Sequence, residues 1–184
     1  MKKGLLMFIA LIALNFTANA QDTKINWMTM NEALDAQAKN PKKIMMDAYT
    51  DWCGPCKMLD KNTFQNPDVV KYVNKHYYAV KFNAEGEGNI NYKGQDFSNP
   101  GYDKSKAGGR NAQHQLAQAF QITAYPTIMF FDEKGEPIAP LPGYKTPQQL
   151  ELYLKLFIDN GHEKITTKEA WEAYQKDFEF EFKG

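Results

Sequence analysis

Apolar residues recur along the chain with two different periods, one typical of strands and one typical of helices. The segments 42–49 (KKIMMDAY) and 78–83 (YAVKFN) are mostly apolar and predict two buried strands, each with a single interior charge. The segment 123–140 predicts two more strands joined by a turn at 132–135. Helical patterns cover about 30–39, the residues from the cysteine motif to 64, a segment from 66 onward, 113–120, 146–159 and a segment from 166 onward. This order predicts an α/β domain with a mixed sheet.

Capping signals support several of these helix boundaries. Thr29 and Glu32 have the spacing of a capping box, in which each side chain satisfies a free backbone amide, and the same spacing recurs at 166–169. In the helix that follows the cysteine motif, both Met58 and Leu59 are expected to face a core.

Two parts of the chain break this alternation. Residues 84–112 are rich in Gly, Asn, Asp, Ser and Lys and predict a long loop or a small insertion. After the helix that starts near 166, the tail 178–182 (FEFEF) alternates Phe with acids, which is a strand-like period. We predict one domain over 21–163 with the insertion 84–112, followed by a C-terminal extension over 164–184. The extension is expected to pack back on the domain, and a partner or dimer surface is the alternative.

The first twenty residues, MKKGLLMFIALIALNFTANA, have the pattern of a secretory signal peptide. Lys2 and Lys3 precede an apolar run, and Ala18 and Ala20 supply the small residues of a cleavage site before Gln21. The apolar run is shorter than the roughly 20 residues that span a bilayer comfortably. This predicts an exported, periplasmic or otherwise extracytoplasmic protein that is soluble after cleavage. An uncleaved anchor is the alternative.

The charges exclude one large class of function. Lys and Arg together number 22, as do Asp and Glu, so the formal net charge is zero. Arg110 is the only arginine, and no basic stripe is present. A nucleic-acid partner is therefore not expected.

The chain has only two cysteines, Cys53 and Cys56, in the motif DWCGPCK between a predicted strand and a predicted helix. A disulfide that closes a loop of about four residues would stabilise the fold by only about 2 kcal/mol, so a structural staple is disfavoured. A zinc site would need two more ligands, and the three histidines are scattered singly along the chain. The remaining option is that the pair passes electrons.

The position of the cysteines at a helix start favours reactivity. Free N–H groups and the positive end of the helix dipole stabilise a thiolate at Cys53, which lowers its pKa. Cys56 lies one turn later, close enough to attack a mixed disulfide at Cys53. Gly54 and Pro55 suit the first helical turn, where proline loses no hydrogen bond.

One carboxylate on a buried strand offers a general base. Asp47 precedes Cys53 by six residues, and burying a carboxylate is costly unless it has a partner or a task. It could accept the proton of Cys56 as that thiol attacks. Lys81, the lone charge of the next strand, is a candidate partner that would tune the pKa of Asp47. A plain buried ion pair is the alternative.

These residues together resemble the thioredoxin family. The resemblance rests on WCGPC at 52–56, Asp47 before it, Lys81 in the next strand, Pro126 before an apolar strand, and Gly143 after a hairpin. It covers about 25–160. The stretches MMDAYTDWCGPCKMLDKNTF and IMFFDEKGEP are most similar to exported thioredoxin-like domains, including the C-terminal domain of the Dsb-type membrane electron transporter.

The resemblance implies a thioredoxin fold and a role for each matching residue. Cys53 would be the attacking thiol, Cys56 the resolving thiol, Asp47 the buried acid and Lys81 its partner. Residues that would bind substrate around the cysteines are Trp52, Gly54, Pro55, Tyr125 and the cis-proline Pro126. No metal or diffusible cofactor is implied, because the redox-active Cys53–Cys56 disulfide carries the electrons.

The function predicted is an extracytoplasmic thiol-disulfide oxidoreductase. The resemblance implies a protein-disulfide reductase, because the Gly-Pro dipeptide goes with reducing members of the family. A disulfide isomerase or oxidase of the same fold is the alternative within this class, and a non-redox peptide- or metal-binding module is the alternative outside it. The expected partners are disulfide-containing or thiol proteins and a membrane electron donor, with the chain itself a monomer. The insertion 84–112 is expected to border the active site and narrow the choice of partner, unless it is a loop that points away.

Overall fold

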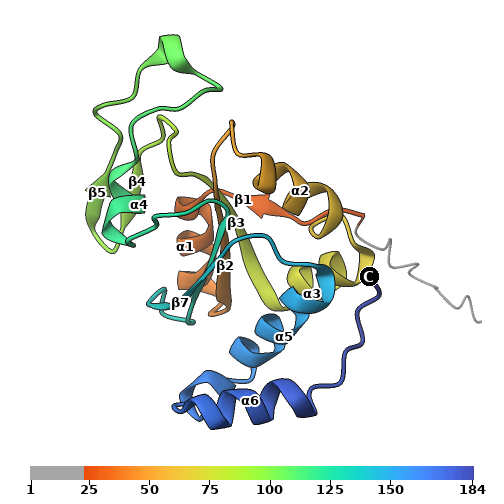
Figure 1. Cartoon of the computed structure of the whole chain (residues 1–184). Coiled ribbons are helices and arrows are strands. Elements are labelled where there is room, and N and C mark those ends of the chain that lie inside the picture. Colours follow the sequence, from red (N-terminus) through yellow and green to blue (C-terminus); the bar gives the residue numbers. More distant parts are fainter. Residues whose placement is uncertain (1–22) are drawn as a thin grey trace, which may run out of the picture.

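The computed structural model describes residues 23–184. The predicted signal peptide at 1–20 lies outside the described residues. Within them, the chain forms the α/β architecture with a mixed central sheet that the sequence predicts (Figure 1).

The strands of the central sheet are β1 (Trp27–Met28), β2 (Lys43–Tyr49), β3 (Tyr77–Asn83), β6 (Thr127–Phe131) and β7 (Pro137–Pro142). Their order across the sheet is β1-β3-β2-β6-β7. β3 runs parallel to β1 and β2, whereas β6 runs antiparallel to β2 and β7. Both predicted buried strands and both strands of the predicted hairpin are therefore present.

The helices are α1 (Met30–Lys39), α2 (Gly54–Asn62), α3 (Pro67–His76), α4 (Gln115–Ala119), α5 (Pro147–Ile158) and α6 (Lys168–Asp177). They cover both faces of the sheet, with α1 on one side and α3 and α5 on the other (Figure 1). Because side chains alternate along a strand, Ile44 and Met46 of β2 pack with α1, and Met45 packs with α3 and α5. The core is thus divided into two layers by the sheet.

The capping signals are confirmed at α1 and corrected at α6. The Thr29 side chain accepts from the backbone N–H of Glu32, and the Glu32 carboxylate accepts from the N–H of Thr29 at 2.7 Å. At α6, Thr167 rather than Thr166 is the N-cap, and its hydroxyl accepts from Ala170 N–H. The predicted box was one residue early, so no acid stands at the third helical position.

The helix after the cysteines buries one of the two side chains expected to face a core. Leu59 is fully buried, but Met58 is 51% exposed. Neighbouring residues on a helix point in different directions, so only one of the pair can face the sheet. The prediction for Met58 was wrong.

The insertion follows β3, forms a small sheet of its own and extends away from the central sheet (Figure 1). It contains β4 (Ile90–Tyr92) and β5 (Gln95–Phe97), which pair antiparallel, and a 3-10 turn, η1 (Lys104–Lys106). The Tyr92 ring packs edge-on against Phe120, and its hydroxyl donates to Gly135 O at 2.6 Å. The base of the insertion is therefore packed on the domain.

The C-terminal residues pack back on the domain without forming a strand. The Trp171 ring of α6 contacts Tyr153 of α5, and Phe182 is buried against Tyr72 of α3. Residues 178–184 contain no strand, so the strand expected from the alternating Phe residues was wrong. Phe180 is 53% exposed. The domain boundaries at 163 and 164 stay a prediction.

Candidate active site

The two cysteines form a disulfide at the start of α2. Cys53 is the N-cap of the helix, and its Sγ accepts from the backbone N–H of Cys56 at 3.1 Å. Both cysteines are only 2% exposed, while Gly54 and Pro55 between them are exposed to solvent. The pair is therefore reached from the side of the Gly-Pro turn.

The start of α2 favours negative charge on Cys53. The first turn contains no acidic residue, so nothing in it opposes the positive end of the helix dipole. The Cys56 N–H already points at the Cys53 sulfur and would stabilise a thiolate there. Reduction of the disulfide would thus leave Cys53 in the place where ionisation is easiest.

Asp47 lies on the central strand β2, directly beside Lys81 on β3. The two residues are Cα partners in the parallel register, and Lys81 Nζ lies 2.6 Å from Asp47 Oδ2. Asp47 is fully buried, and its other oxygen, Oδ1, has no hydrogen-bond partner within residues 23–184. Burial raises the pKa of Asp47 to about 6, although the Lys81 charge and hydrogen bond act to lower it.

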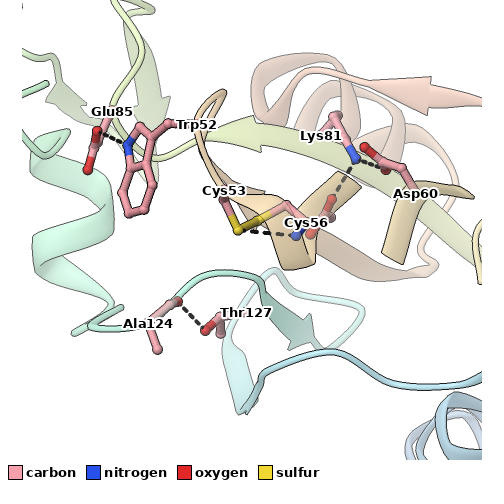
Figure 2. Close-up of a disulfide and its surroundings, with 9 residues drawn as sticks. Trp52, Cys53, Cys56, Asp60, Lys81, Glu85, Ala124 and Thr127 are labelled. Atoms are coloured by element: carbon pink, nitrogen blue, oxygen red, sulfur yellow. Dashed lines mark hydrogen bonds and ion pairs between the residues drawn. A yellow bond between two sulfur atoms is a disulfide. The ribbon is translucent and has the colours of Figure 1, made fainter. Parts of the chain in front are cut away.

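Lys81 also binds a second carboxylate, Asp60 of α2, which sequence reasoning missed (Figure 2). Burial alone would lower the pKa of Lys81, but the charge of Asp47 and the hydrogen bonds to both carboxylates outweigh it and raise this pKa. Lys81 is therefore charged at neutral pH. Three aromatic rings also surround its ammonium group, with centroids 5.0, 4.9 and 5.4 Å from Nζ: Trp27, Tyr49 and Phe64.

The loop before β6 faces the cysteine pair (Figure 2). The Tyr125–Pro126 peptide bond is cis, as the resemblance implied. Pro126 is buried, and its carbonyl accepts from Gly143 N–H at 2.8 Å. The Thr127 hydroxyl closes the loop by donating to Ala124 O at 2.8 Å. This loop presents its backbone beside the disulfide.

Trp52 borders the disulfide on the side of the insertion (Figure 2). Its indole N–H donates to Glu85 Oε2 at 2.7 Å, and its ring meets Tyr125 edge-on at 6.1 Å. The Arg110 guanidinium lies 3.9 Å from the centre of the same ring. The insertion therefore contacts the candidate active site through Glu85 and Arg110, and its effect on the choice of partner stays a prediction.

All nine predicted site residues lie around the cysteine pair or its buried acid, and three further residues join them. Asp60 follows Cys53 by two helical turns, a spacing that could have revealed it. Arg110 stood out in the sequence as the only arginine of the chain. Its contact with Trp52 could not be predicted, because the two residues are distant in sequence. No local sequence pattern indicated that Glu85 would contact Trp52. The roles of these residues remain proposals.

Two other features are absent from the described residues, a metal-binding cluster and a membrane-spanning helix. Residues 23–184 contain no group of three or more His, Cys, Asp or Glu side chains that could bind a metal ion. In the same residues, no helix has the length and apolar character needed to cross a membrane.

Curated relatives match this chain over most of its length. A thiol:disulfide interchange protein DsbD from Pectobacterium atrosepticum is 29% identical over 147 residues, covering 79% of this chain and 20% of the relative. The DsbD of Salmonella typhi is 33% identical over 134 residues, covering 71% of this chain and 18% of the relative. The chain thus spans about a fifth of the length of the curated relatives it matches.

A solved structure and a family model agree on the fold. A thioredoxin-fold protein from Helicobacter pylori superposes with a TM-score of 0.57 at 20% identity, covering 74% of this chain and 82% of that one. The model of the thioredoxin-like domain matches residues 30–158, which include the cysteines, Asp47, Lys81 and the cis-proline. With the fold, the disulfide and the family model in agreement, the chain belongs to the thioredoxin-like domain family.

Proposed function

We propose that this chain is a thiol-disulfide oxidoreductase that reduces disulfides in protein substrates through Cys53 and Cys56. One observation carries the proposal: a disulfide at the N-cap of α2 lies in a fold that also buries an acid with a pKa of about 6. Relatives named thiol:disulfide interchange protein support it.

The first step requires the reduced pair. Cys53 ionises, and its thiolate attacks one sulfur of the substrate disulfide. A new bond forms between Cys53 and that sulfur, the substrate disulfide breaks, and the other substrate sulfur leaves as a thiolate. The start of α2 assists because its N–H groups hold the negative charge on Cys53 before the attack.

The second step uses Cys56 and the buried acid. The Cys56 thiol gives its proton to the Asp47 carboxylate and attacks Cys53 Sγ. The Cys53–Cys56 disulfide forms, the mixed disulfide breaks, and the second substrate thiolate leaves. The chain has then lost two electrons and the substrate has gained them. Asp47 returns its proton, and the proton released by Cys53 is taken up by the other substrate thiolate.

The residues around the disulfide would bind the substrate chain. Gly54 has open space where a Cβ atom would stand, so a peptide can approach the first turn of α2 closely. We assign the backbone at Tyr125 and cis-Pro126 to an extended substrate segment, and Trp52 and Pro55 to its flanks.

We propose the reducing direction of electron flow because of the Gly-Pro dipeptide, which in this family goes with reducing members. Each turnover leaves the chain oxidised, so a dithiol protein must reduce it again. Outside the cytoplasm, where the leader 1–20 would direct the chain, a membrane protein would supply these electrons. We propose that the chain works as a monomer.

Reduction of a peptide with an internal disulfide tests the proposal. The reduced protein should convert the peptide to its dithiol form in an equimolar amount, and the Cys53→Ser, Cys56→Ser double variant should not. A redox titration of the pair with glutathione buffers then gives its potential. A potential more oxidising than about −120 mV would contradict the reducing direction. Failure of the reduced wild type to change the peptide would contradict the exchange activity itself.

A further inference from the structure

Arg110 occupies an unusual position in the insertion. Its guanidinium stacks on Trp52, the residue that immediately precedes the attacking cysteine, at 3.9 Å from the ring centre. A guanidinium on an aromatic face keeps its in-plane N–H groups free to bind another partner. The stacking therefore positions a cation at the border of the active site without using its hydrogen-bonding edge.

The residue after Arg110 anchors this arrangement. The Asn111 backbone N–H donates to Glu85 Oε2 at 2.8 Å, the same oxygen that accepts from the Trp52 indole. The Asn111 side chain also exchanges two hydrogen bonds with the backbone of Asp103, each 2.8 Å long. Because these contacts hold both Trp52 and the backbone beside Arg110, they favour the stacked position of the guanidinium before any partner arrives.

Among the described residues, Arg110 differs from the other cations of the insertion in its charge pairing. Lys93 pairs with Glu136, Lys104 with Glu87 and Lys106 with Asp103, whereas within residues 23–184 no carboxylate lies within ion-pair distance of the Arg110 guanidinium. The Glu85 carboxylate accepts from Trp52 and Asn111 rather than from Arg110. Arg110 is also exposed to solvent. An exposed guanidinium that is stacked on a tryptophan and has free donors suits a carboxylate supplied by another molecule.

We propose that Arg110 is a specificity-determining residue that contacts an acidic side chain of the substrate, close to the disulfide under attack. The inference rests on the proposed function, since the substrate must lie across Cys53 for its flanks to reach Trp52. The preferred substrate is a polypeptide with Asp or Glu within a few residues of the reacting cysteine. The contact is charge-assisted and lies at the surface, so salt weakens it.

Three peptides test this assignment. Each has the same internal disulfide, and they differ at one position beside it, which is Asp, Asn or Lys. In low salt, pre-reduced wild type should give the highest second-order rate constant in a single turnover for the Asp peptide, about two- to fivefold above the Asn peptide, and the lowest for the Lys peptide. The preference should shrink in about 0.5 M salt, where the screening length is short.

Matched variants locate the preference. Arg110→Gln should bring the ratio of single-turnover rate constants between the Asp and Asn peptides to about one. Arg110→Lys should restore part of the ratio, because the charge remains but the planar pair of guanidinium N–H donors is lost. Lys106→Gln changes the insertion by the same charge and should leave the ratio as in wild type. Loss of the ratio in Lys106→Gln as well would mean that overall charge, not Arg110, sets it, and would overturn the assignment.

Two further outcomes separate this inference from the function it rests on. Wild type that reduces all three peptides at equal rates, or Arg110→Gln that slows them all by the same factor, would overturn the inference and leave the reductase function intact. In the second case, Arg110 would only hold Trp52 in place. Wild type that reduces none of the peptides would contradict the proposed function, and with it the inference.

Discussion

Lys81 Nζ lies 2.6 Å from Asp47 Oδ2, while the other oxygen of the same carboxylate has no hydrogen-bond partner in residues 23–184. The cation stabilises the ionised form of Asp47, and burial opposes it more strongly. The balance leaves the pKa of Asp47 at about 6, so the group can both take and release a proton near neutral pH. This is the property that a base for Cys56 needs.

Replacing Asp47 with Asn should stabilise the oxidised protein at neutral pH. The folded pKa of about 6 lies above the ordinary value of 3.8, so the folded protein holds this proton more tightly than the unfolded chain. Stability is therefore lost as the pH rises from about 4 to about 6. Asp47→Asn should gain up to roughly 3 kcal/mol at pH 7.5 and much less at pH 3.5. Urea denaturation at both pH values measures the gain.

An exposed acid provides the control for that comparison. Asp35 lies on the solvent side of α1, and Asp35→Asn makes the same change of charge. Its effect should stay within about 0.5 kcal/mol at both pH values. A gain in Asp47→Asn that does not depend on pH would contradict the raised pKa of Asp47.

Replacing Lys81 with Met should shift the pH dependence of the resolving step to higher pH. Met keeps much of the side-chain volume among the aromatic rings but removes the cation that lowers the pKa of Asp47. Less Asp47 is then ionised near pH 6, and resolution should be about tenfold slower there, while the rates converge at high pH. Release of a peptide from its mixed disulfide with Cys53 gives this rate. An unchanged pH profile would show that Asp47 is not the base in the resolving step.

Replacing Glu151 with Gln should release the C-terminal tail. The fully buried Glu151 carboxylate accepts from the backbone N–H groups of Glu181 and Phe182, each at 2.9 Å, and pairs with Lys155. The amide would turn a donor toward these N–H groups and lose the charge, costing about 1–3 kcal/mol. Faster amide hydrogen exchange over 178–184 and a lower urea midpoint should follow.

An exposed partner of the same lysine is the control for the tail. Glu181 also pairs with Lys155, but its side chain is 75% exposed. Glu181→Gln should change stability by less than about 1 kcal/mol and leave exchange in the tail slow. Equal effects of the two variants would show that Glu151 does not hold the tail.

Replacing Glu85 with Gln should loosen the insertion at the active site. The carboxylate accepts from both Trp52 and Asn111, and an amide oxygen accepts more weakly. Amide exchange over 99–112 should become faster, and the fluorescence of Trp52 should change. Glu87→Gln, which affects only an exposed pair with Lys104, should alter neither signal. Slow exchange in both variants would mean that other contacts hold the insertion.

The parts of the fold that follow local rules could be predicted from the sequence. The Thr29–Glu32 box set the start of α1, because both partners lie within one helical turn. Asp47 and Lys81 each stood alone in an apolar strand, so their pairing followed once the strands were neighbours. The cysteine motif was also recognisable, because its residues are contiguous at 52–56.

The contacts that depend on distant parts of the chain could not be predicted. Trp52 and Glu85 are 33 residues apart, and no local pattern relates them. The strands β4 and β5 have three residues each and turn at Lys93-Gly94, both with positive φ, where lysine is not a typical turn residue. In the tail, a buried carboxylate satisfies the backbone N–H groups that a neighbouring strand would otherwise bind.

The two cysteines have separate roles in the proposed mechanism, and trapping of a mixed disulfide measures these roles directly. Reduced Cys56→Ser is mixed with a peptide that contains one disulfide, and the adduct is mapped by mass spectrometry. We predict a stable adduct in which the peptide is joined to Cys53, and little or no adduct with Cys53→Ser, because Cys56 lacks the N-cap position that stabilises a thiolate at Cys53. An adduct that forms equally well on Cys56, or no adduct at Cys53, would contradict the proposed mechanism.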